Sequence, residues 1–168
     1  MHVSEFLDVL TPLCAIDIDP NVITCPKLLY YLLMSFDPEK ISMVLRLIRA
    51  QLPALIQTAQ DFGVVTKHLQ LEQITAVIET LNAQLPELVK TVEDFKMLTS
   101  NLQQDQVTAV IEGLNTQLPK LAKTAEDFKM LTSNLQQDQV TAVIEGLNTQ
   151  LPKLVKTAKD FKILTSNL

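Results

Sequence analysis

The sequence contains few of the residues that interrupt helices or build sharp turns. Among 168 residues there are three glycines and no tryptophan, and only 5% of the residues are aromatic. So few glycines leave little scope for the tight turns of antiparallel sheets, whereas short helix-to-helix connections need few of them. The hydrophobic content of 47% is sufficient for one continuous core. We therefore predict an all-α protein.

Cysteine and histidine are also scarce. Cys14 and Cys25 are the only cysteines, and His2 and His68 are the only histidines. The cysteines show neither CxxC spacing nor a histidine at ligand spacing, so the sequence offers no zinc motif, and free thiols fit better than a disulfide. We expect no cofactor and no metal site.

Long apolar segments and an excess of positive charge are both missing. The longest apolar run, 28–34, has seven residues, whereas a membrane helix needs roughly 20. The N-terminus also lacks the basic and apolar regions of a signal peptide. Nucleic-acid binding needs Lys and Arg massed on one face, and the net charge is −5. The sequence predicts no membrane span, no signal peptide and no nucleic-acid partner.

What the chain has instead is a period of 33 residues. The dipeptide Leu-Pro recurs at 52–53, 85–86, 118–119 and 151–152, and Asp-Phe recurs at 61–62, 94–95, 127–128 and 160–161. A fixed period of roughly 20 to 50 residues is typical of solenoids, whose units bury their apolar faces on one another. We expect a right-handed α-solenoid. Its parts are a helical cap or degenerate repeat in 1–35 and four tandem repeats at 36–68, 69–101, 102–134 and 135–168.

Each repeat is expected to hold two helices joined by a short bridging turn. In the third repeat the apolar residues of 104–118 recur at the spacing of one helical face: Val107, Val110, Ile111, Leu114 and Leu118. Pro119 cannot continue that helix without losing a backbone donor, so it should open a new turn or kink the helix. Thr124 is the expected N-cap of the second helix, with Asp127 completing a capping box.

Two positions of the repeat differ in how much they vary. Phenylalanine occupies the same position in all four repeats, as Phe62, Phe95, Phe128 and Phe161. We interpret this aromatic ring as the core anchor of each unit. The position two residues earlier holds Gln60, Glu93, Glu126 and Lys159. Because its charge changes sign between repeats, this position is expected to face water.

No group of residues has the arrangement that catalysis requires. A catalytic acid, base or nucleophile must lie at one particular place rather than once per repeat. The carboxylate pair Glu126 and Asp127 becomes Lys159 and Asp160 in the last repeat. Asp127 is therefore better explained as a helix cap, and the protein is not expected to be an enzyme.

Amide side chains that recur at a fixed phase are the candidate binding residues. A ladder of neutral donors and acceptors along a solenoid would suit extended recognition of a protein or peptide partner. A polar outer face with helix-end caps is the simpler explanation of the same residues. In the third repeat the ladder consists of Gln103, Gln104, Asn115, Gln117 and Asn134.

The last repeat is nearly identical to the one before it, although solenoids usually end in a unit with a polar outer face. We expect Ile163, Leu164 and Leu168 to leave an apolar surface exposed. Either the chain associates end to end through this C-terminal repeat, or it is part of a longer array.

Three motifs of the first repeat carry a resemblance to a known class of proteins. They are Asp-Pro-Glu-Lys at 37–40, Gln-Leu-Pro at 51–53 and Thr-Ala-Gln-Asp-Phe at 58–62. Together they resemble the short helical tandem repeats of effector proteins that intracellular bacteria deliver into host cells. Later copies replace the first motif with Gln-Gln-Asp-Gln, as at 103–106. The likeness covers 36–168.

This resemblance implies a noncatalytic interaction scaffold, a bacterial effector or a fragment of one, whose partner is a host protein. It also implies a location in the bacterial cytoplasm before delivery into the host cell. Two other functions remain open: an oligomerising or regulatory adaptor, and a small enzyme with its site in 1–35. A second likeness, to the DNA-reading repeats of plant-pathogen activators, lacks their paired-glycine loop, because Gly113 and Gly146 stand alone.

Overall fold

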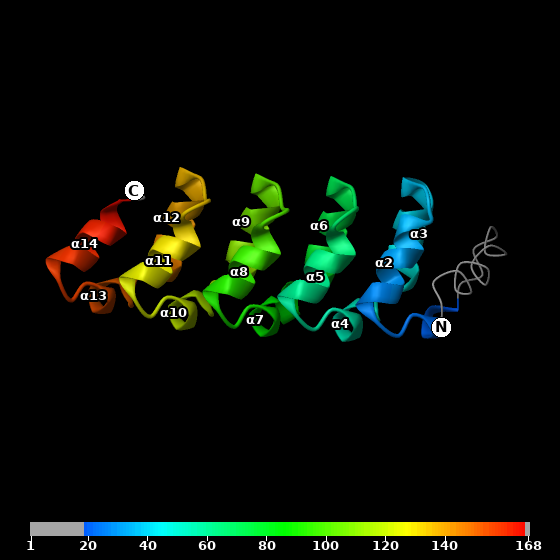
Figure 1. The fold of residues 1–168 in the computed structure, drawn as a ribbon, viewed down its shortest axis with the longest axis horizontal. Helices are drawn as coiled ribbons and strands as arrows, with labels where there is room; N and C mark the ends of the chain where they lie inside the picture. Colours follow the sequence, from blue (N-terminus) through cyan, green and yellow to red (C-terminus); the bar gives the residue numbers. More distant parts are fainter. Residues whose placement is uncertain (1–18, 167–168) are drawn as a thin grey trace.

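The computed structural model describes residues 19–166, and all regular secondary structure in this part of the chain is helical. The predicted all-α class is confirmed. Figure 1 shows that equivalent helices of successive repeats follow one another along the long axis of the molecule. The series runs from α2 (Pro26–Met34) near one end to α14 (Ala158–Thr165) at the other.

The first helices of the four repeats are α3 (Pro38–Leu47), α6 (Leu71–Leu81), α9 (Gln104–Gly113) and α12 (Gln137–Gly146). Asp37 caps α3, because its Oδ1 accepts a hydrogen bond of 3.0 Å from the Lys40 N–H. Pro38 lies in the first turn, where its missing donor has no cost.

A short helix begins at every Leu-Pro dipeptide: α4 (Leu52–Leu55), α7 (Leu85–Leu88), α10 (Leu118–Leu121) and α13 (Leu151–Leu154). In the second repeat a 3-10 turn, η3 (Asn82–Gln84), precedes it. The sequence predicts one helix over 104–118, but α9 ends earlier, at Gly113. A continuous helix would clash at the Asn115 carbonyl and lack the N–H of Pro119, so the chain turns and starts again.

The second helices, α5 (Ala59–Thr66), α8 (Val92–Thr99), α11 (Ala125–Thr132) and α14, all begin with a Thr-Asp capping box. In α11 the Asp127 N–H donates to Thr124 Oγ1 at 3.1 Å, and the Thr124 N–H donates to Asp127 Oδ2 at 2.9 Å. Two N-terminal donors are thus satisfied by one residue pair. The predicted caps are confirmed.

Part of the segment that precedes the first repeat is also described. The 3-10 turn η2 (Pro20–Val22) and helix α2 lie one period of 33 residues before α4 and α5, and α2 packs against α5. Cys25, which precedes α2, is a half-buried free thiol. Residues 1–18, with Cys14 and His2, lie outside the described residues.

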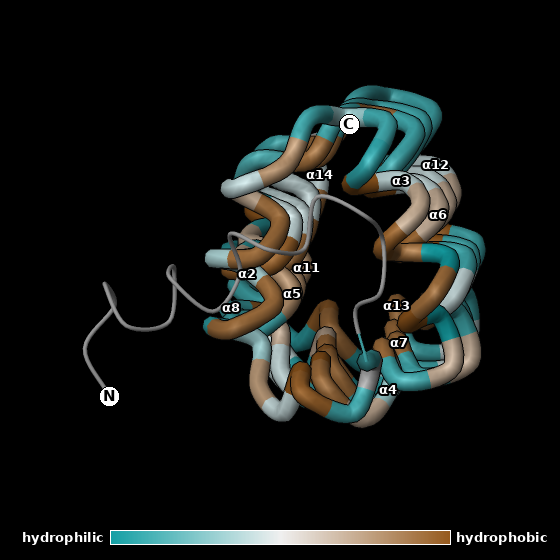
Figure 2. Tube along the Cα trace, turned by 90° about the vertical axis from the view of Figure 1, so that its right-hand side faces the viewer, coloured by the Kyte–Doolittle hydropathy of each residue, from teal (hydrophilic) through white to brown (hydrophobic). Residues whose placement is uncertain are grey.

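The core lies between three rows of helices. Figure 2 looks along the long axis and shows the first, short and second helices as three sides around an apolar interior. Phe62, Phe95 and Phe128 are 0%, 2% and 1% exposed, which confirms the predicted anchor in three repeats. The five apolar residues predicted to face inward from the first helix of the third repeat are all buried.

Candidate functional site

The five predicted ladder residues do not lie on one continuous row. Gln103 and Gln104 lie at the start of α9, whereas Asn115 and Gln117 follow its other end. A helix of ten residues is about 15 Å long, so two groups of the predicted ladder are separated by that distance. Asn134 follows α11 and belongs with the first group.

The first group borders a cavity that residues of the second, third and fourth repeats line together. Gln104 and Asn134 both line this cavity, whose volume is about 510 Å³, together with Gln136 and Gln139. The Gln104 amide also donates a hydrogen bond of 3.3 Å to Asp138 Oδ1 of the next repeat. At least one of the predicted ladder residues, Gln104, is therefore hydrogen-bonded to the next repeat of the same chain.

The amide that links successive repeats most closely, Gln106, is not among the predicted ladder residues. Gln106 is 3% exposed. Its Oε1 accepts from the Gln103 N–H at 3.0 Å, and its Nε2 donates to the Leu71 carbonyl oxygen at 2.9 Å and to Thr75 Oγ1 at 3.3 Å. The side chain thus caps α9 and ties it to α6.

The same bridge recurs on both sides of the third repeat. Gln73 Nε2 donates to the Pro38 carbonyl oxygen at 2.8 Å, and Gln139 Nε2 donates to the Gln104 carbonyl oxygen at 2.8 Å. Gln106 lies four residues before Val110, on the inward face of α9. This spacing is the feature of the sequence that indicates the burial of Gln106. A buried amide needs hydrogen-bond partners inside the protein. The side chains of Gln73, Gln106 and Gln139 therefore serve to connect neighbouring repeats.

The second group of ladder residues lies where two repeats approach closely. A Cβ on Gly146 would be 2.8 Å from Asn115 Oδ1 and 2.6 Å from Leu118 Cδ1. Gly113 has the same relation to Asn82, at 2.6 Å. Both glycines close their helices, α9 and α12, and permit the contact with the preceding repeat. Asn115 is exposed to solvent, but its side-chain oxygen also abuts the fourth repeat.

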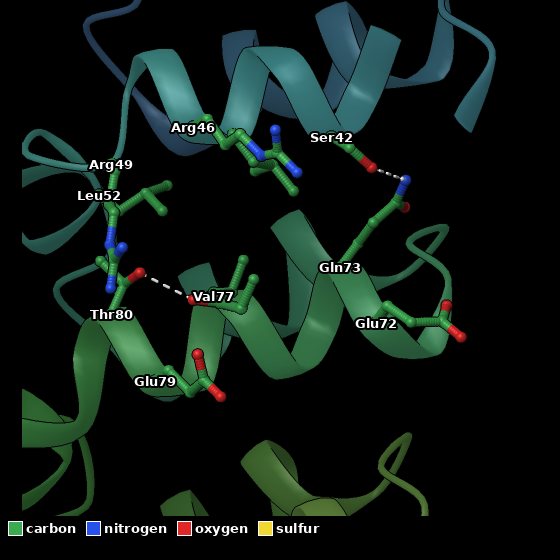
Figure 3. A pocket seen from close by; sticks show the side chains of 11 residues that line it. Ser42, Arg46, Arg49, Leu52, Glu72, Gln73, Val77, Glu79 and Thr80 are labelled. Carbon is green, nitrogen blue, oxygen red and sulfur yellow. Dashed lines mark hydrogen bonds between the residues drawn. The ribbon is translucent and has the colours of Figure 1, made fainter. Parts of the chain in front are cut away.

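Exposed grooves lie between neighbouring first helices. We call the row formed by α3, α6, α9 and α12 the first-helix wall. The groove between α3 and α6 has a volume of about 270 Å³, and the next one, between α6 and α9, about 240 Å³. Figure 3 shows the α3–α6 groove: the bond of 3.2 Å from Gln73 Nε2 to Ser42 Oγ crosses one end, and Arg49 extends toward Thr80 at the other.

The first-helix wall is strongly acidic beyond α3. Helices α6, α9 and α12 contain no lysine or arginine. They carry the exposed carboxylates Glu72, Glu79, Asp105, Glu112, Asp138 and Glu145. Two of these belong to each helix, seven residues apart, which places both on the same outer side.

Within residues 19–166, two carboxyl groups have clearly lowered pKa values, and both are helix caps. The N–H of Lys40 is the main cause that lowers the pKa of Asp37, and the hydrogen bond with the Thr157 side chain is the main cause that lowers the pKa of Asp160. Hydrogen bonds to a carboxylate favour its charged form. Both groups stabilise the start of a helix, α3 and α14 respectively.

The outer face of the fourth repeat is apolar, but different residues from those predicted are exposed. Leu164 is only 7% exposed and Ile163 is half-buried, whereas Phe161 is 61% and Val155 40% exposed. Leu168 lies outside the described residues. The equivalent residue in the third repeat, Phe128, is covered by the fourth. The prediction of Phe161 as a buried anchor is therefore wrong, because no repeat packs over it in this structure.

We compared the chain with protein-family models, with curated proteins and with solved structures. None of the three comparisons finds a match. Within residues 19–166, no helix combines the length and the apolar character that crossing a bilayer would require.

Proposed function

We propose that this chain is a noncatalytic scaffold for protein–protein interaction, built as a right-handed α-solenoid of 33-residue repeats. The observation that carries the proposal is the repetition of an exposed groove on the first-helix wall, between α3 and α6 and again between α6 and α9. Residues at equivalent positions border each groove, so a partner that lies along the wall meets a groove at each step. Extended binding surfaces of this kind are the usual use of solenoids.

Polar residues that recur from repeat to repeat have structural roles, and these roles support a noncatalytic function. Asp94, Asp127 and Asp160 accept hydrogen bonds from the threonine N–H at the start of their helices. The recurring amides Gln73, Gln106 and Gln139 connect repeats. These groups recur once per repeat because the second helix of each repeat needs an N-terminal cap and the first helix needs a bond to the preceding repeat.

The resemblance of 36–168 to effector repeats supports a host protein as the partner and a bacterial effector, or a fragment of one, as the scaffold. In that case the protein acts after delivery from the bacterial cytoplasm into a host cell. A single dominant partner captured from eukaryotic lysate and identified by mass spectrometry would support the effector; self-association alone would favour the adaptor.

The affinity for a purified partner tests whether the wall binds it. Deleting 102–134 removes one period and should leave a cooperative fold with weaker binding, because contacts accumulate over several repeats. Glu112→Lys on the wall should change the affinity, whereas Glu126→Lys should not, since the fourth repeat already carries Lys159 there. Complete loss of binding on deletion, with the fold intact, would contradict a distributed surface. An enzymatic activity that survives removal of 102–168 would instead favour the alternative of a small enzyme with its site in 1–35.

Self-association through the fourth repeat is a second candidate function, favoured by the exposure of Phe161. The outer face formed by Val155, Ala158 and Phe161 matches the face of the third repeat, Ala122, Ala125 and Phe128, that is buried. Light scattering of the 168-residue chain should show mass rising with concentration, and Phe161→Glu should restore a monomer. A wild-type chain that stays monomeric at high concentration would contradict this candidate.

A further inference from the structure

The α3–α6 groove breaks the charge pattern of the first-helix wall. Arg46 and Arg49 lie at the positions that hold Glu79 and Asn82 one period later. They are the only arginines in the chain, and both line the same groove. A difference from the repeat pattern at two positions, three residues apart, distinguishes this groove from the next one.

The arginine side chains are available to a ligand. Both are exposed, and among the described residues neither guanidinium lies within 4.0 Å of a carboxylate. Glu72 and Glu79 of α6 line the same groove, but among the described residues neither forms an ion pair with an arginine. Glu79 also borders the α6–α9 groove, and Figure 3 shows its carboxyl group on the side of α6 away from α3. Two unpaired guanidinium groups three residues apart can bind one carboxylate or two adjacent carboxylates with paired N–H donors.

The remainder of the groove is small and mixed in character, because Ser42, Glu72, Gln73, Glu79 and Thr80 line it beside four apolar residues. Leu45, Leu52, Ala76 and Val77 contribute to its lining. Pockets that enclose drug-sized ligands have volumes of roughly 300–1,000 Å³, and this groove, at about 270 Å³, falls just below that range. It is better suited to an aliphatic side chain of a peptide that continues along the surface.

We infer that the α3–α6 groove binds an acidic peptide segment of a protein partner, with carboxylates at Arg46 and Arg49 and a neighbouring aliphatic side chain over Ala76, the exposed apolar residue of the lining. The inference rests on the proposed scaffold function and names the partner chemistry at one groove. Carboxylates on α9 and α12 repel the same segment, so the arginine pair fixes where it binds along the wall.

The arginines provide a direct test by NMR. A chain with two arginines has two side-chain Nε–H signals in its ¹⁵N spectrum, so both can be assigned by substitution. The probe is the capped peptide acetyl-Ala-Leu-Glu-Leu-Glu-Ala-amide, titrated into the full 168-residue chain. Both Nε–H signals and the Thr80 amide should shift. Unchanged arginine signals at millimolar peptide overturn the inference.

Matched variants separate this site from general attraction between charges. Affinity is measured by fluorescence anisotropy of the labelled peptide. The double variant Arg46→Gln/Arg49→Gln should bind at least about tenfold more weakly, because charge-assisted hydrogen bonds are lost. Lys120→Gln/Lys123→Gln removes the same charge from exposed residues outside the groove and should change affinity little. Arg46→Lys/Arg49→Lys should lose part of the affinity, since lysine cannot form the paired bonds. Equal losses in the glutamine and control variants overturn the inference.

Changes in the peptide test its two kinds of contact. Replacing both glutamates by lysine should abolish binding, and replacing both leucines by alanine should weaken it. The peptide site is overturned if the lysine peptide or the alanine peptide binds as tightly as the original probe. It is also overturned if inorganic phosphate displaces the probe at constant ionic strength. If a captured partner binds the arginine double variant as tightly as the wild type, the scaffold proposal stands and the groove inference fails. If the probe binds but no partner is found, the groove stands and the scaffold fails.

Discussion

The Nε2 of Gln106 donates a hydrogen bond of 2.9 Å to the main-chain carbonyl oxygen of Leu71, which lies 35 residues earlier in the chain. Its Oε1 accepts a hydrogen bond from the N–H of Gln103, the N-cap residue of the same helix, α9. One buried amide therefore fixes the start of α9 and its distance from α6. Both bonds are part-buried, so their loss would leave polar groups partly shielded from water and without partners.

Gln106→Ala should lower the free energy of unfolding by about 1–3 kcal/mol, because the Gln103 N–H and the Leu71 carbonyl lose a buried partner. Gln137→Ala is the matched control: it replaces an exposed glutamine in the first turn of α12. Urea denaturation of both variants checks the prediction. Equal stability of the two variants would mean that the bridge adds nothing to stacking.

Phe128→Ala should cost about 3–5 kcal/mol, the range for removing a buried aromatic side chain. Phe161→Ala should cost much less, since Phe161 is 61% exposed and Phe128 only 1%. Denaturant unfolding of the pair measures the difference. Glu126→Lys is a further control that should be nearly neutral. A loss for Phe161→Ala as large as that for Phe128→Ala would contradict the exposed face of the fourth repeat.

Two glycine substitutions should have opposite signs. Gly63→Ala should stabilise the protein by about 0.5–1 kcal/mol, because Gly63 lies inside α5 and nothing lies within 4 Å of a Cβ there. Gly113→Ala should destabilise it by about 1–3 kcal/mol, because the new Cβ would lie 2.7 Å from Leu85 Cδ1, a fully buried side chain. Thermal unfolding of both variants provides the measurement. Stabilisation by Gly113→Ala would show that the two repeats can separate at no cost.

The lowered pKa values of Asp37 and Asp160 predict a loss of stability in acid. A carboxyl group whose pKa is lower in the folded state contributes stability above its unfolded pKa, about 3.9. That contribution is lost as the pH falls through the lower folded pKa. The chemical shift of the Asp160 carboxyl carbon, followed from pH 6 downward, should give a midpoint below that of an unstructured aspartate.

Asp160→Asn should remove part of the pH dependence of unfolding in the acid range. Glu145→Gln removes one exposed carboxyl group from α12 and corrects for the change in net charge. If Asp160 titrates with a midpoint at or above that of the unstructured residue, its hydrogen bonds do not favour the charged form, and the prediction is wrong.

Local patterns predicted the helices and their starts because those features depend on residues close in sequence. The Thr124–Asp127 box needs only four consecutive residues. The Leu-Pro dipeptides break each unit at a fixed place because proline has no backbone donor. The inward stripe of the first helix follows from the helical period.

The candidate site was harder to predict because its geometry depends on neighbouring repeats. Gln104, Asn115 and Gln117 have similar chemistry in sequence, but the structure separates them along α9. Gln106 is distinguished only by its inward direction and by a carbonyl group in the preceding repeat. Arg46 and Arg49 can be found by aligning the repeats, yet only the packing of α3 against α6 shows that both border one groove.

The sequence by itself determined that the segments around Phe128 and Phe161 form the same capped helix, because they differ little and the caps are local. Only the tertiary structure decided that one ring is buried and the other is 61% exposed. Helix formation depends on the hydrogen bonds and side chains of the segment itself. Burial of an aromatic ring depends on what packs over it, and here that is a helix 33 residues further along the chain.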